Sequence, residues 1–275
     1  MFTDKYTMTL GEIKQLAGIS DQAIREYERK GIIPSIINED NGYHLYHYPD
    51  LQRIQFLRYY RRMGMSVKEA SSLVNASTQE TLSLSLQRHA DAIRSNIRRE
   101  EAVLKAIESQ THDLSLISSL LGSFEESTMP EMYVLRCSKN GRILKDRELT
   151  SLIKQWSDSM PIVKVGALHK YQHMIDDVQP DPCFLIEAAF QDFVDISNQT
   201  FVSRIRPCRC IKTMIRISSY DRDYVHCNTH VVDYLKKSNL TPTGEILTNT
   251  IANKYIHPLY PDDPSDYIVE WIPVG

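Results

Sequence analysis

The sequence predicts a multidomain α+β protein with three parts. They are an N-terminal, all-α winged helix-turn-helix, a long coiled-coil helix, and a C-terminal α+β antiparallel-sheet domain with two β-α-β-β repeats. Short amphipathic stretches alternate with turn signals over residues 1–75, and residues 79–108 lack Gly and Pro. Short runs rich in Val, Ile, Tyr and Thr then follow a small, acidic segment. We therefore expect domains at 1–75, 76–121 and 132–275, with a linker at 122–131.

The first two helices are predicted around a glycine turn. Thr9 is placed to cap a helix over residues 10–17, and a Glu three residues later completes a capping box. Gly18 suits the end of that helix, and Ser20 can cap a second helix over residues 21–30. Two short helices joined by a tight, glycine-containing turn are the helix-turn-helix pattern, whose second helix enters the major groove of DNA.

A hairpin and two further helices complete the first domain. Asn41-Gly42 lies between two short apolar strands, which is a strong hairpin signal, and a hairpin after a helix-turn-helix is a wing. Pro49 opens a third helix, Gly64 ends it, and Ser66 caps a short fourth helix.

The charge is distributed unevenly along the chain. The net charge of −3 argues weakly against a nucleic-acid binder. Residues 1–110, however, carry a net charge of +1, and residues 111–275 carry −4. Within the first part, residues 51–70 hold four Arg and one Lys against a single Glu. Such a helix can turn its arginines toward a polyanion, although a solvated helix face is the simpler alternative.

Two residues near the start of the second helix are candidates for DNA contact. Gln22 and Arg25 are of the types that reach base edges or phosphates. The alternative for Arg25 is a surface ion pair with Glu26 or Glu28.

Three consecutive segments carry a family resemblance. LGEIKQLAGIS, AIREYERKGIIP and NGYHLYHYPDLQRIQFLRYYRRMGMSVKEA resemble the N-terminal DNA-binding domain of MerR-family transcription regulators over about residues 8–75. The resemblance implies DNA contacts for Arg25, Tyr27 and Tyr43. The chain departs from the family at Glu26, where a tyrosine is common, and at His44, where an arginine is common. The full set expected at DNA is Thr9, Gln22, Arg25, Tyr27, Lys30, Tyr43, His44, Arg53, Arg58 and Arg61.

The stretch 79–108 predicts a dimerisation helix. Its apolar residues recur at alternating spacings of four and three, with one polar defect at Glu100. The seam residues are Leu86, Ala90, Ile93, Ile97, Leu104 and Ile107. Packing onto the C-terminal domain is the alternative to pairing with a second chain. The MerR resemblance implies an antiparallel coiled coil here, and hence a homodimer on a pseudo-palindromic DNA site. Metal-sensing members carry cysteines around this helix, whereas this chain has none between residues 1 and 136.

The sequence of the C-terminal part predicts two halves of similar length, each with its strands and helix in the order β-α-β-β. The expected strands are 132–137, 162–168, 183–190, 210–217, 245–251 and 267–272, and the expected helices are 146–157 and 222–237. Such a repeat suggests two pseudo-symmetric units that share an antiparallel sheet, with a cleft between them.

The C-terminal part resembles the GyrI-like domain of multidrug-responsive MerR regulators. The resemblance rests on the order of its elements, on Ile205-Arg206-Pro207 and on the terminal segment YIVEWIPV. In that family a buried carboxylate ringed by aromatic residues binds lipophilic cations. At the usual position of the acid, shortly after Gly244, this chain reads LTNT. Glu187 or Glu270 is a possible substitute; otherwise the ligand is neutral or zwitterionic. The expected effector-binding residues are Tyr133, Tyr171, Glu187, Tyr255, Glu270 and Trp271.

Several other classes of protein are not expected. The chain has no run of eighteen apolar residues and no signal-peptide pattern, and its five cysteines suggest reduced cytosolic thiols. Cys208, Cys210, His226, Cys227 and His230 are metal-ligand types, but their spacing is not that of a zinc ribbon or finger. We therefore expect no metal, no cofactor, no catalytic residue and no membrane contact.

The expected function is a cytoplasmic, homodimeric, ligand-responsive transcription regulator. By resemblance, it binds double-stranded promoter DNA, meets RNA polymerase there, and distorts the promoter to activate transcription when a lipophilic or drug-like effector binds. One alternative is a regulator that senses a peptide or protein. The other is a GyrI-like hydrolase fused to a DNA-binding domain, for which the sequence offers no nucleophile–base pair.

Overall fold

The computed structural model describes residues 7–34, 36–39, 41–75, 78–176, 178–218, 224–255, 261–262 and 264–275, without the side chains of 224–227 and 253–255. The chain divides into two compact units, Met1–Ile97 and Arg98–Gly275, whose boundary falls inside one long helix.

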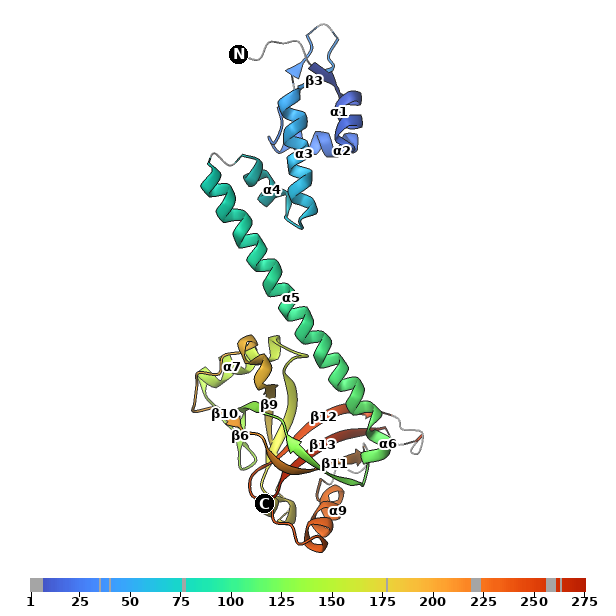
Figure 1. Ribbon diagram of the computed structural model, residues 1–275, viewed down its shortest axis with the longest axis vertical. Helices are drawn as coiled ribbons and strands as arrows, with labels where there is room; N and C mark the ends of the chain where they lie inside the picture. The colour runs from blue at the N-terminus through green and yellow to red at the C-terminus, as the bar shows by residue number, and fades with distance from the viewer. Residues whose placement is uncertain are drawn as a thin grey trace. The chain divides into compact units, whose positions relative to one another are not determined.

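The N-terminal unit contains the predicted helix-turn-helix and wing (Figure 1). Its helices are α1 (Leu10–Ala17), α2 (Asp21–Arg29), α3 (Tyr48–Arg62) and α4 (Val67–Val74), and its strands are β1 (Thr7–Thr9), β2 (Ile36–Ile37) and β3 (His44–His47). Thr9 and Ser66 form the expected capping boxes, and Ser20 caps α2. Gly18 takes the left-handed conformation (φ 60°) that ends α1.

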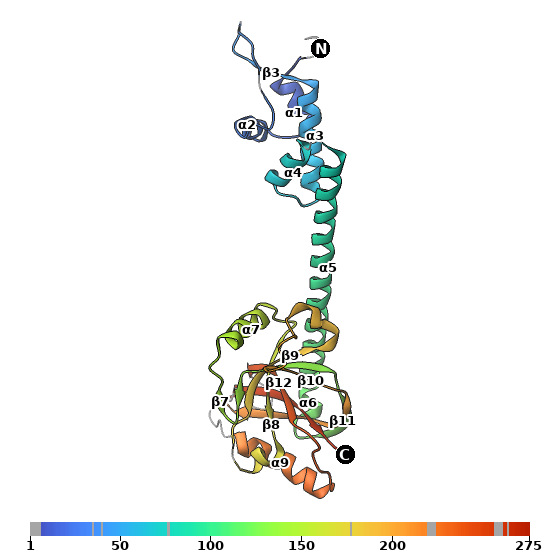
Figure 2. The same cartoon turned by 90° about the vertical axis from the view of Figure 1, so that its left-hand side faces the viewer.

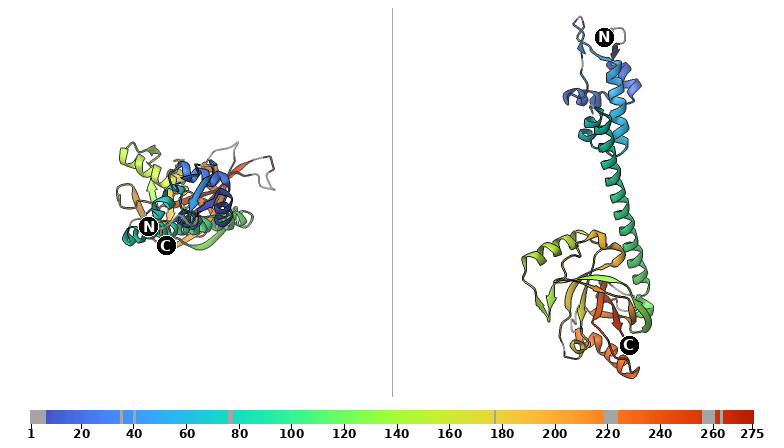
Figure 3. Two further views of the ribbon diagram at one scale, coloured as in Figure 1. Left: turned by 90° about the horizontal axis from the view of Figure 1, so that it is seen from above. Right: turned by 60° about the vertical axis from the view of Figure 1, so that its left-hand side comes forward.

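The core of this unit forms where the helices meet the small sheet. Ile13, Ile24, Ile54 and Leu57 are fully buried in it, together with Tyr46 of the wing strand. Strand β3 lies between β1 and β2 in a three-stranded sheet. The β2–β3 hairpin extends away from the helices of the unit (Figure 3).

The long helix α5 (Gln79–Ser115) has 37 residues and so continues past the predicted end at 108. Its first turns pack against the core of the N-terminal unit through Leu82 and Leu86. Its last turns bury Ala102, Ala106 and Asp113 in the C-terminal unit.

The C-terminal unit is built on an eight-stranded sheet in the order β10-β5-β9-β8-β12-β13-β11-β4. These strands are β4 (Phe124–Met129), β5 (Met132–Arg136), β8 (Lys164–His169), β9 (Asp181–Glu187), β10 (Val202–Ile205), β11 (Cys208–Ser218), β12 (Ile246–Tyr255) and β13 (Ser265–Pro273). A two-stranded ribbon, β6 (Ser138–Lys139) and β7 (Arg142–Ile143), lies beside it. Strands β8 and β12 pair at the middle of the large sheet.

In the described part of this unit, four helices and one 3₁₀ helix accompany the sheet. They are α6 (Ile117–Leu120), α7 (Arg147–Asp158), α8 (Tyr171–Ile175), η1 (Ala188–Phe193) and α9 (Tyr224–Lys237). Helix α7 packs over the half that contains β5 and β9, and α9 packs over the half that contains β11 and β13 (Figure 2). The opposite face of the sheet buries Met214, Leu247 and Val269 together with Ile117 and Leu120 of the α6 region.

The six strands and two helices expected in this unit are present, except that residues 188–190, expected in a strand, begin the 3₁₀ helix η1, and that residues 222–223 of the expected second helix lie outside the described residues. The expected linker at 122–131 is wrong, because it contains β4, which pairs with β11 along Phe124–Met129. Phe124 stacks on Tyr234 of α9 at 3.9 Å, and the Ser123 carbonyl accepts a hydrogen bond from Thr213 (2.7 Å). The small and acidic residues that suggest a linker are therefore those of an edge strand with an exposed face.

Candidate nucleic-acid interface and ligand-binding domain

The recognition helix α2 presents two free polar side chains. Gln22 and Arg25 are both exposed, and within the described part of the chain Arg25 makes no hydrogen bond or ion pair. Glu26 instead pairs with Lys30 at 2.6 Å, and Glu28 is engaged by the wing. The alternative of an Arg25 ion pair with either glutamate is therefore wrong. The guanidinium remains available to an external anion.

Glu28 joins the recognition helix to the wing. Its carboxylate accepts a hydrogen bond from the Tyr46 hydroxyl (2.8 Å) and lies 3.1 Å from His44 Nδ1. The Glu28 side chain is only 15% exposed, and Tyr46 is buried. Burial, reinforced by the adjacent Glu28 carboxylate, raises the pKa of Tyr46. Sequence reasoning missed Glu28, because the contact spans 18 positions and no local pattern reports it.

The wing exposes one aromatic residue near its turn. Tyr43 is 68% exposed, and its backbone N–H donates to Asn41 Oδ1 at 3.0 Å. Gly42 has φ 71°, a left-handed conformation that favours glycine and lets the chain reverse here. His44, one residue on, is turned to Glu28, which places it in the wing's internal network.

Three predicted DNA residues also make contacts within the N-terminal unit. Thr9 exchanges hydrogen bonds with Glu12 at the start of α1, and these bonds lower the pKa of Glu12. Tyr27 is half-buried against the core of the unit, and Lys30 is bound to Glu26. Their DNA contacts stay predictions.

Three of the four arginines of α3 bind backbone carbonyl groups within the unit. Arg58 donates to the Ala17 carbonyl at the end of α1, and Arg61 donates to the Met65 carbonyl at 2.8 Å. Arg53 lies 3.5 Å from the Ile32 carbonyl. Each guanidinium carries five N–H donors, so these bonds leave others for phosphates. A phosphate role for these arginines also stays a prediction.

The predicted seam residues of α5 are largely exposed within their own units. In the N-terminal unit, Ile93 and Ile97 are 40% and 52% exposed. In the C-terminal unit, Leu104 and Ile107 are 55% and 53% exposed. Leu86 and Ala90, at the start of the series, are half-buried. Packing onto the C-terminal domain occurs on another face of this helix, where Ala102 and Ala106 are buried, and pairing with a second chain through the seam stays a prediction.

The expected effector residues are distributed over both faces of the large sheet. Glu270 is completely buried on the α9 face, and one of its carboxylate oxygens lies 3.6 Å from His169 Nε2. Trp271, the next residue of β13, points to the opposite face and is 8% exposed in that core. Glu187, also on that face, is paired with Lys164 at 3.3 Å.

The aromatic candidates are also separated. Tyr133 packs in the α7 core and lies beneath the Arg204 guanidinium, 5.9 Å from it. Tyr171 begins α8 and packs against the α9 core. The side chain of Tyr255 lies outside the described residues. An aromatic cage around a carboxylate is therefore not formed by the described members of this set, and their effector roles stay predictions.

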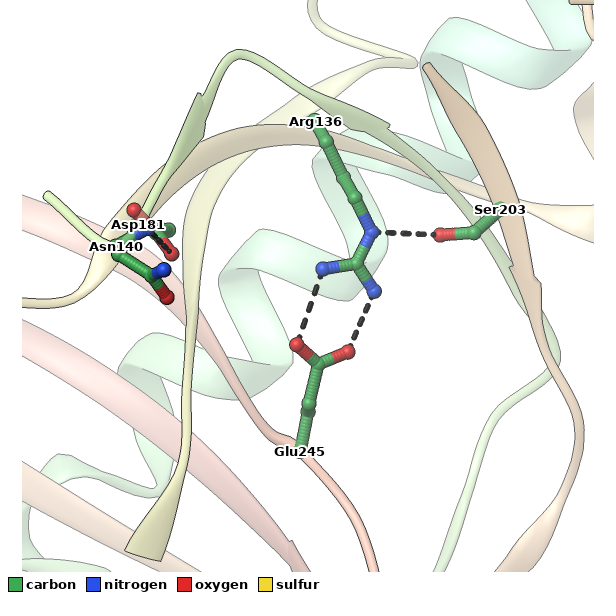
Figure 4. A network of polar contacts seen from close by, with 5 residues as sticks. All are labelled: Arg136, Asn140, Asp181, Ser203 and Glu245. Atoms are coloured by element: carbon green, nitrogen blue, oxygen red, sulfur yellow. Dashed lines mark hydrogen bonds and ion pairs between the residues drawn. The ribbon is translucent and has the colours of Figure 1, made fainter. Parts of the chain in front are cut away.

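A polar network closes one side of a cavity of about 350 Å³ in the C-terminal unit (Figure 4). Arg136 donates two hydrogen bonds to Glu245 (3.0 and 2.5 Å) and a third to Ser203 (3.2 Å). Hydrogen bonding from Arg136 lowers the pKa of Glu245. The neighbouring Asp181 accepts backbone N–H bonds from Asn140 and Gly141 (2.9 and 2.8 Å). The Arg136 and Glu245 charges of this wall are thus paired with each other.

A second cavity, of about 210 Å³, lies between the last turns of α5 and strands β8 and β12. Its lining residues are Ala106, Gln110, Asp113, Met160, Pro161, Val163, Lys164, Val165, Asn249, Thr250 and Ile251. None of the six expected effector residues is among them. Two of its residues, Asp113 and Asn249, are polar and buried.

No group of three or more His, Cys, Asp and Glu side chains among the described residues is placed to hold a metal ion. No helix in the described ranges is long and apolar enough to cross a membrane.

Comparison with known proteins finds a family and several relatives that are similar to the N-terminal part of this chain. Residues 8–77 match the family described as MerR HTH family regulatory protein. An uncharacterised HTH-type transcriptional regulator of Synechocystis is 28% identical over 113 residues, 41% of this chain and 81% of that protein. The HTH-type transcriptional regulator CueR of Escherichia coli O157:H7 is 29% identical over 102 residues, 37% of this chain and 71% of that one. A probable heavy metal-dependent transcriptional regulator of Haemophilus influenzae is 34% identical over 67 residues, 24% of this chain and 52% of that protein.

Among solved structures, the EcmrR–DNA complex in EcmrR-RPo matches 98% of this chain and 99% of that chain, with 15% identity and a TM-score of 0.36. The N-terminal unit of this chain is a winged helix-turn-helix of the DNA-binding class. Specifically, it is a MerR-family helix-turn-helix domain. The family match and the relatives indicate a transcriptional regulator rather than an enzyme.

Proposed function

We propose that this protein is a ligand-responsive transcription regulator that binds a pseudo-palindromic promoter site as a homodimer. The observation that carries the proposal is the free polar surface of the recognition helix and wing. Gln22, Arg25 and Tyr43 are exposed, while Glu28 holds the wing strand against α2. Helix α2 then enters the major groove and the wing contacts the adjacent backbone. Arg53, Arg58 and Arg61 supply phosphate contacts that position the domain.

The homodimer forms through the exposed seam of α5. Leu104 and Ile107 leave large apolar surfaces in water, and Ile93 and Ile97 continue the series. Pairing with a second copy removes these surfaces from water at a gain of roughly 25 cal/mol per Å². A two-fold dimer matches a two-fold DNA site.

The C-terminal unit acts as the effector-binding domain. Its segments β5-α7-β8-β9 and β11-α9-β12-β13 follow the same element order, and β8 pairs with β12 between them. This arrangement supports two β-α-β-β repeats and a GyrI-like domain that binds a small-molecule effector. The effector shifts the dimer between two conformations, and the favoured one distorts the promoter so that RNA polymerase, in the cytoplasm, initiates transcription.

The DNA-binding proposal is tested by fluorescence anisotropy with the upstream promoter region of the gene itself. Arg25→Ala is expected to weaken binding about tenfold and to reduce the slope of log K against log salt by about 0.9. Arg94→Ala is the matched control, since it removes the same charge from an exposed ion pair on α5. Equal losses in the two variants, or no complex at low salt, contradict the proposal.

The dimer proposal is tested by sedimentation velocity on the full chain. Ile97→Glu is expected to shift the protein toward the monomer, because it would place a carboxylate in the apolar seam of each chain. Ser95→Glu adds the same charge at an exposed position outside the seam and should leave the dimer intact. A dimer that survives Ile97→Glu at every concentration contradicts pairing through this face.

A further inference from the structure

The last turns of α5 have two different faces. Ala102, Ala106 and Asp113 lie on one side of the helix and are buried in the C-terminal unit. Leu104 and Ile107 lie on the other side and are more than half exposed. The spacing of four and seven residues between the buried positions keeps them on one helix face. Any group inserted under the buried face therefore acts on the helix that carries the seam.

The cavity under this face, named here the α5 cavity, is apolar along much of its wall. Met160, Pro161 and Val163 line one part of it, and Ile251 and Ala106 line another. Its volume of about 210 Å³ is below the range of about 300–1,000 Å³ that is usual for drug-sized ligands. The α5 cavity is therefore suited to a short aliphatic body.

The α5 cavity also contains two buried polar side chains without partners. Asp113 is 8% exposed and Asn249 is 3% exposed. Within the described ranges of the chain, neither side chain makes a hydrogen bond or an ion pair. A largely buried carboxylate without a partner is stabilised by an external donor, so a ligand that supplies such a donor binds favourably at this place.

The charge that remains in the α5 cavity is negative. Lys164 also lines it, but its ammonium group contacts Ser109 Oγ (3.1 Å) and the Glu187 carboxylate (3.3 Å). This ion pair matches the lysine charge, which leaves Asp113 as the unmatched charge. A ligand that satisfies Asp113 must therefore be a cation.

The polar groups further select a cation with N–H donors. The Asp113 carboxylate and the Asn249 amide oxygen are both hydrogen-bond acceptors. Gln110 donates its amide N–H to the Ile251 carbonyl (3.3 Å), which leaves its amide oxygen as a third acceptor. No aromatic residue is among the described residues that line the α5 cavity, so the cation–π contacts that favour quaternary ammonium ions are not provided by them.

We propose that the α5 cavity binds a small primary or secondary alkylammonium ion, with its head on Asp113 and Asn249 and its aliphatic chain along Met160 and Ile251. This inference rests on the proposed function for its regulatory meaning, since the ligand is then the effector. Bound ligand fixes α5 to strands β8 and β12 and so alters the presentation of Leu104 and Ile107 on the other face of the helix. Regulation follows because the bound and free states differ in affinity for the ligand.

Isothermal titration calorimetry on the full chain tests the binding step with matched probes. Hexylammonium is expected to bind, and hexyltrimethylammonium and hexanol are expected to bind at least about tenfold more weakly, because they lack the charged N–H donors. Asp113→Asn should weaken hexylammonium binding by a similar factor. Glu108→Gln, an exposed carboxylate on the same helix, should leave it unchanged. Equal binding of the two ammonium ions, equal binding by Asp113→Asn, or no binding of hexylammonium at millimolar concentration overturns the proposal.

Two further measurements separate this proposal from the proposed function. Hexylammonium should slow amide hydrogen exchange in residues 102–113 of the wild type but not of Asp113→Asn; unchanged exchange in the wild type overturns the action on α5. DNA binding without any amine should be the same for the wild type and Asp113→Asn. If the wild type binds promoter DNA but not hexylammonium, the ligand assignment fails while the regulator stands; if it binds no DNA, the proposed function itself fails.

Discussion

Removal of the Glu28 carboxylate is expected to loosen the wing from the recognition helix. Glu28 accepts the Tyr46 hydroxyl at 2.8 Å and lies 3.1 Å from His44, with its side chain only 15% exposed. A hydrogen bond to a charged group contributes about 1.5–3 kcal/mol, and a buried hydroxyl left without a partner costs about 1–3 kcal/mol. We therefore expect Glu28→Ala to destabilise the N-terminal unit by about 2 kcal/mol. For a domain of this size, that is a fall in Tm of about 10 °C.

The assay must report on the N-terminal unit alone. Both tryptophans, Trp156 and Trp271, lie in the C-terminal unit, so their fluorescence follows only that unit. Far-UV circular dichroism follows both units, and a transition in the dichroism that the fluorescence does not share belongs to the N-terminal unit. Glu28→Ala should shift that transition and leave the fluorescence transition in place.

A double-mutant cycle isolates the contact between Glu28 and Tyr46. Tyr46→Phe removes the same hydrogen bond, so the double variant should be about 1 kcal/mol more stable than the sum of the two single changes predicts. Glu26→Ala is the control, because it breaks an exposed ion pair with Lys30 that contributes about 0–1 kcal/mol. The reasoning is refuted if Glu28→Ala is no more damaging than Glu26→Ala, or if the cycle is additive.

Two predictions concern the C-terminal unit, and both can be read by tryptophan fluorescence. Hydrogen bonding from Arg136 holds the pKa of Glu245 below its ordinary value of 4.5, so the folded unit binds this proton less readily than the unfolded chain. The resulting stability is present above pH 4.5 and is lost as the pH falls through the folded pKa. Glu245→Gln should therefore lower stability at neutral pH and flatten its acid dependence below pH 4.5; an unchanged acid limb would contradict this. Separately, a Cβ at Gly166 would overlap the Thr248 carbonyl oxygen, whereas a Cβ at Gly244 would make only ordinary contacts. Gly166→Ala should destabilise the unit by at least about 3 kcal/mol through the central β8–β12 pairing, and Gly244→Ala by less than about 1 kcal/mol. Similar urea midpoints for the two variants would show that the sheet relaxes around the added methyl group.

Local features of the fold were predictable because their causes are local. A capping residue, a left-handed glycine and an apolar period act over three to eleven residues, and they predicted the starts of α1, α2 and α4. The same reasoning predicted six strands and two helices of the C-terminal unit in order, but it missed β4, β6, β7, β10 and the short helices α6 and α8. It failed at residues 122–131, where the small, acidic composition of strand β4 resembles that of a linker. Only its pairing partner β11, about 80 residues later, makes that segment a strand.

The candidate sites divide in the same way. The exposure of Gln22, Arg25 and Tyr43 was predictable, because the start of a helix and a hairpin turn place them by local geometry, and their contact with DNA stays a prediction. The candidate ligand-binding residues of the C-terminal unit were less predictable, because an acidic side chain in a strand can point to either face of the sheet. Glu270 lies beneath α9, whereas Asp113, on the long helix, lines a cavity with Asn249.

The sequence alone therefore determined the helix-turn-helix, the wing, the long helix with its apolar seam and the alternation of elements in the C-terminal unit. The tertiary structure decided which charges are matched. Glu28 meets Tyr46 across 18 positions, Arg136 meets Glu245 across 109, and Asp113 is left without a partner beside strand β12. The physical reason is that propensity and capping act through neighbouring peptide groups. The desolvation and pairing of a charge depend instead on whatever the folded chain brings within about 4 Å of it.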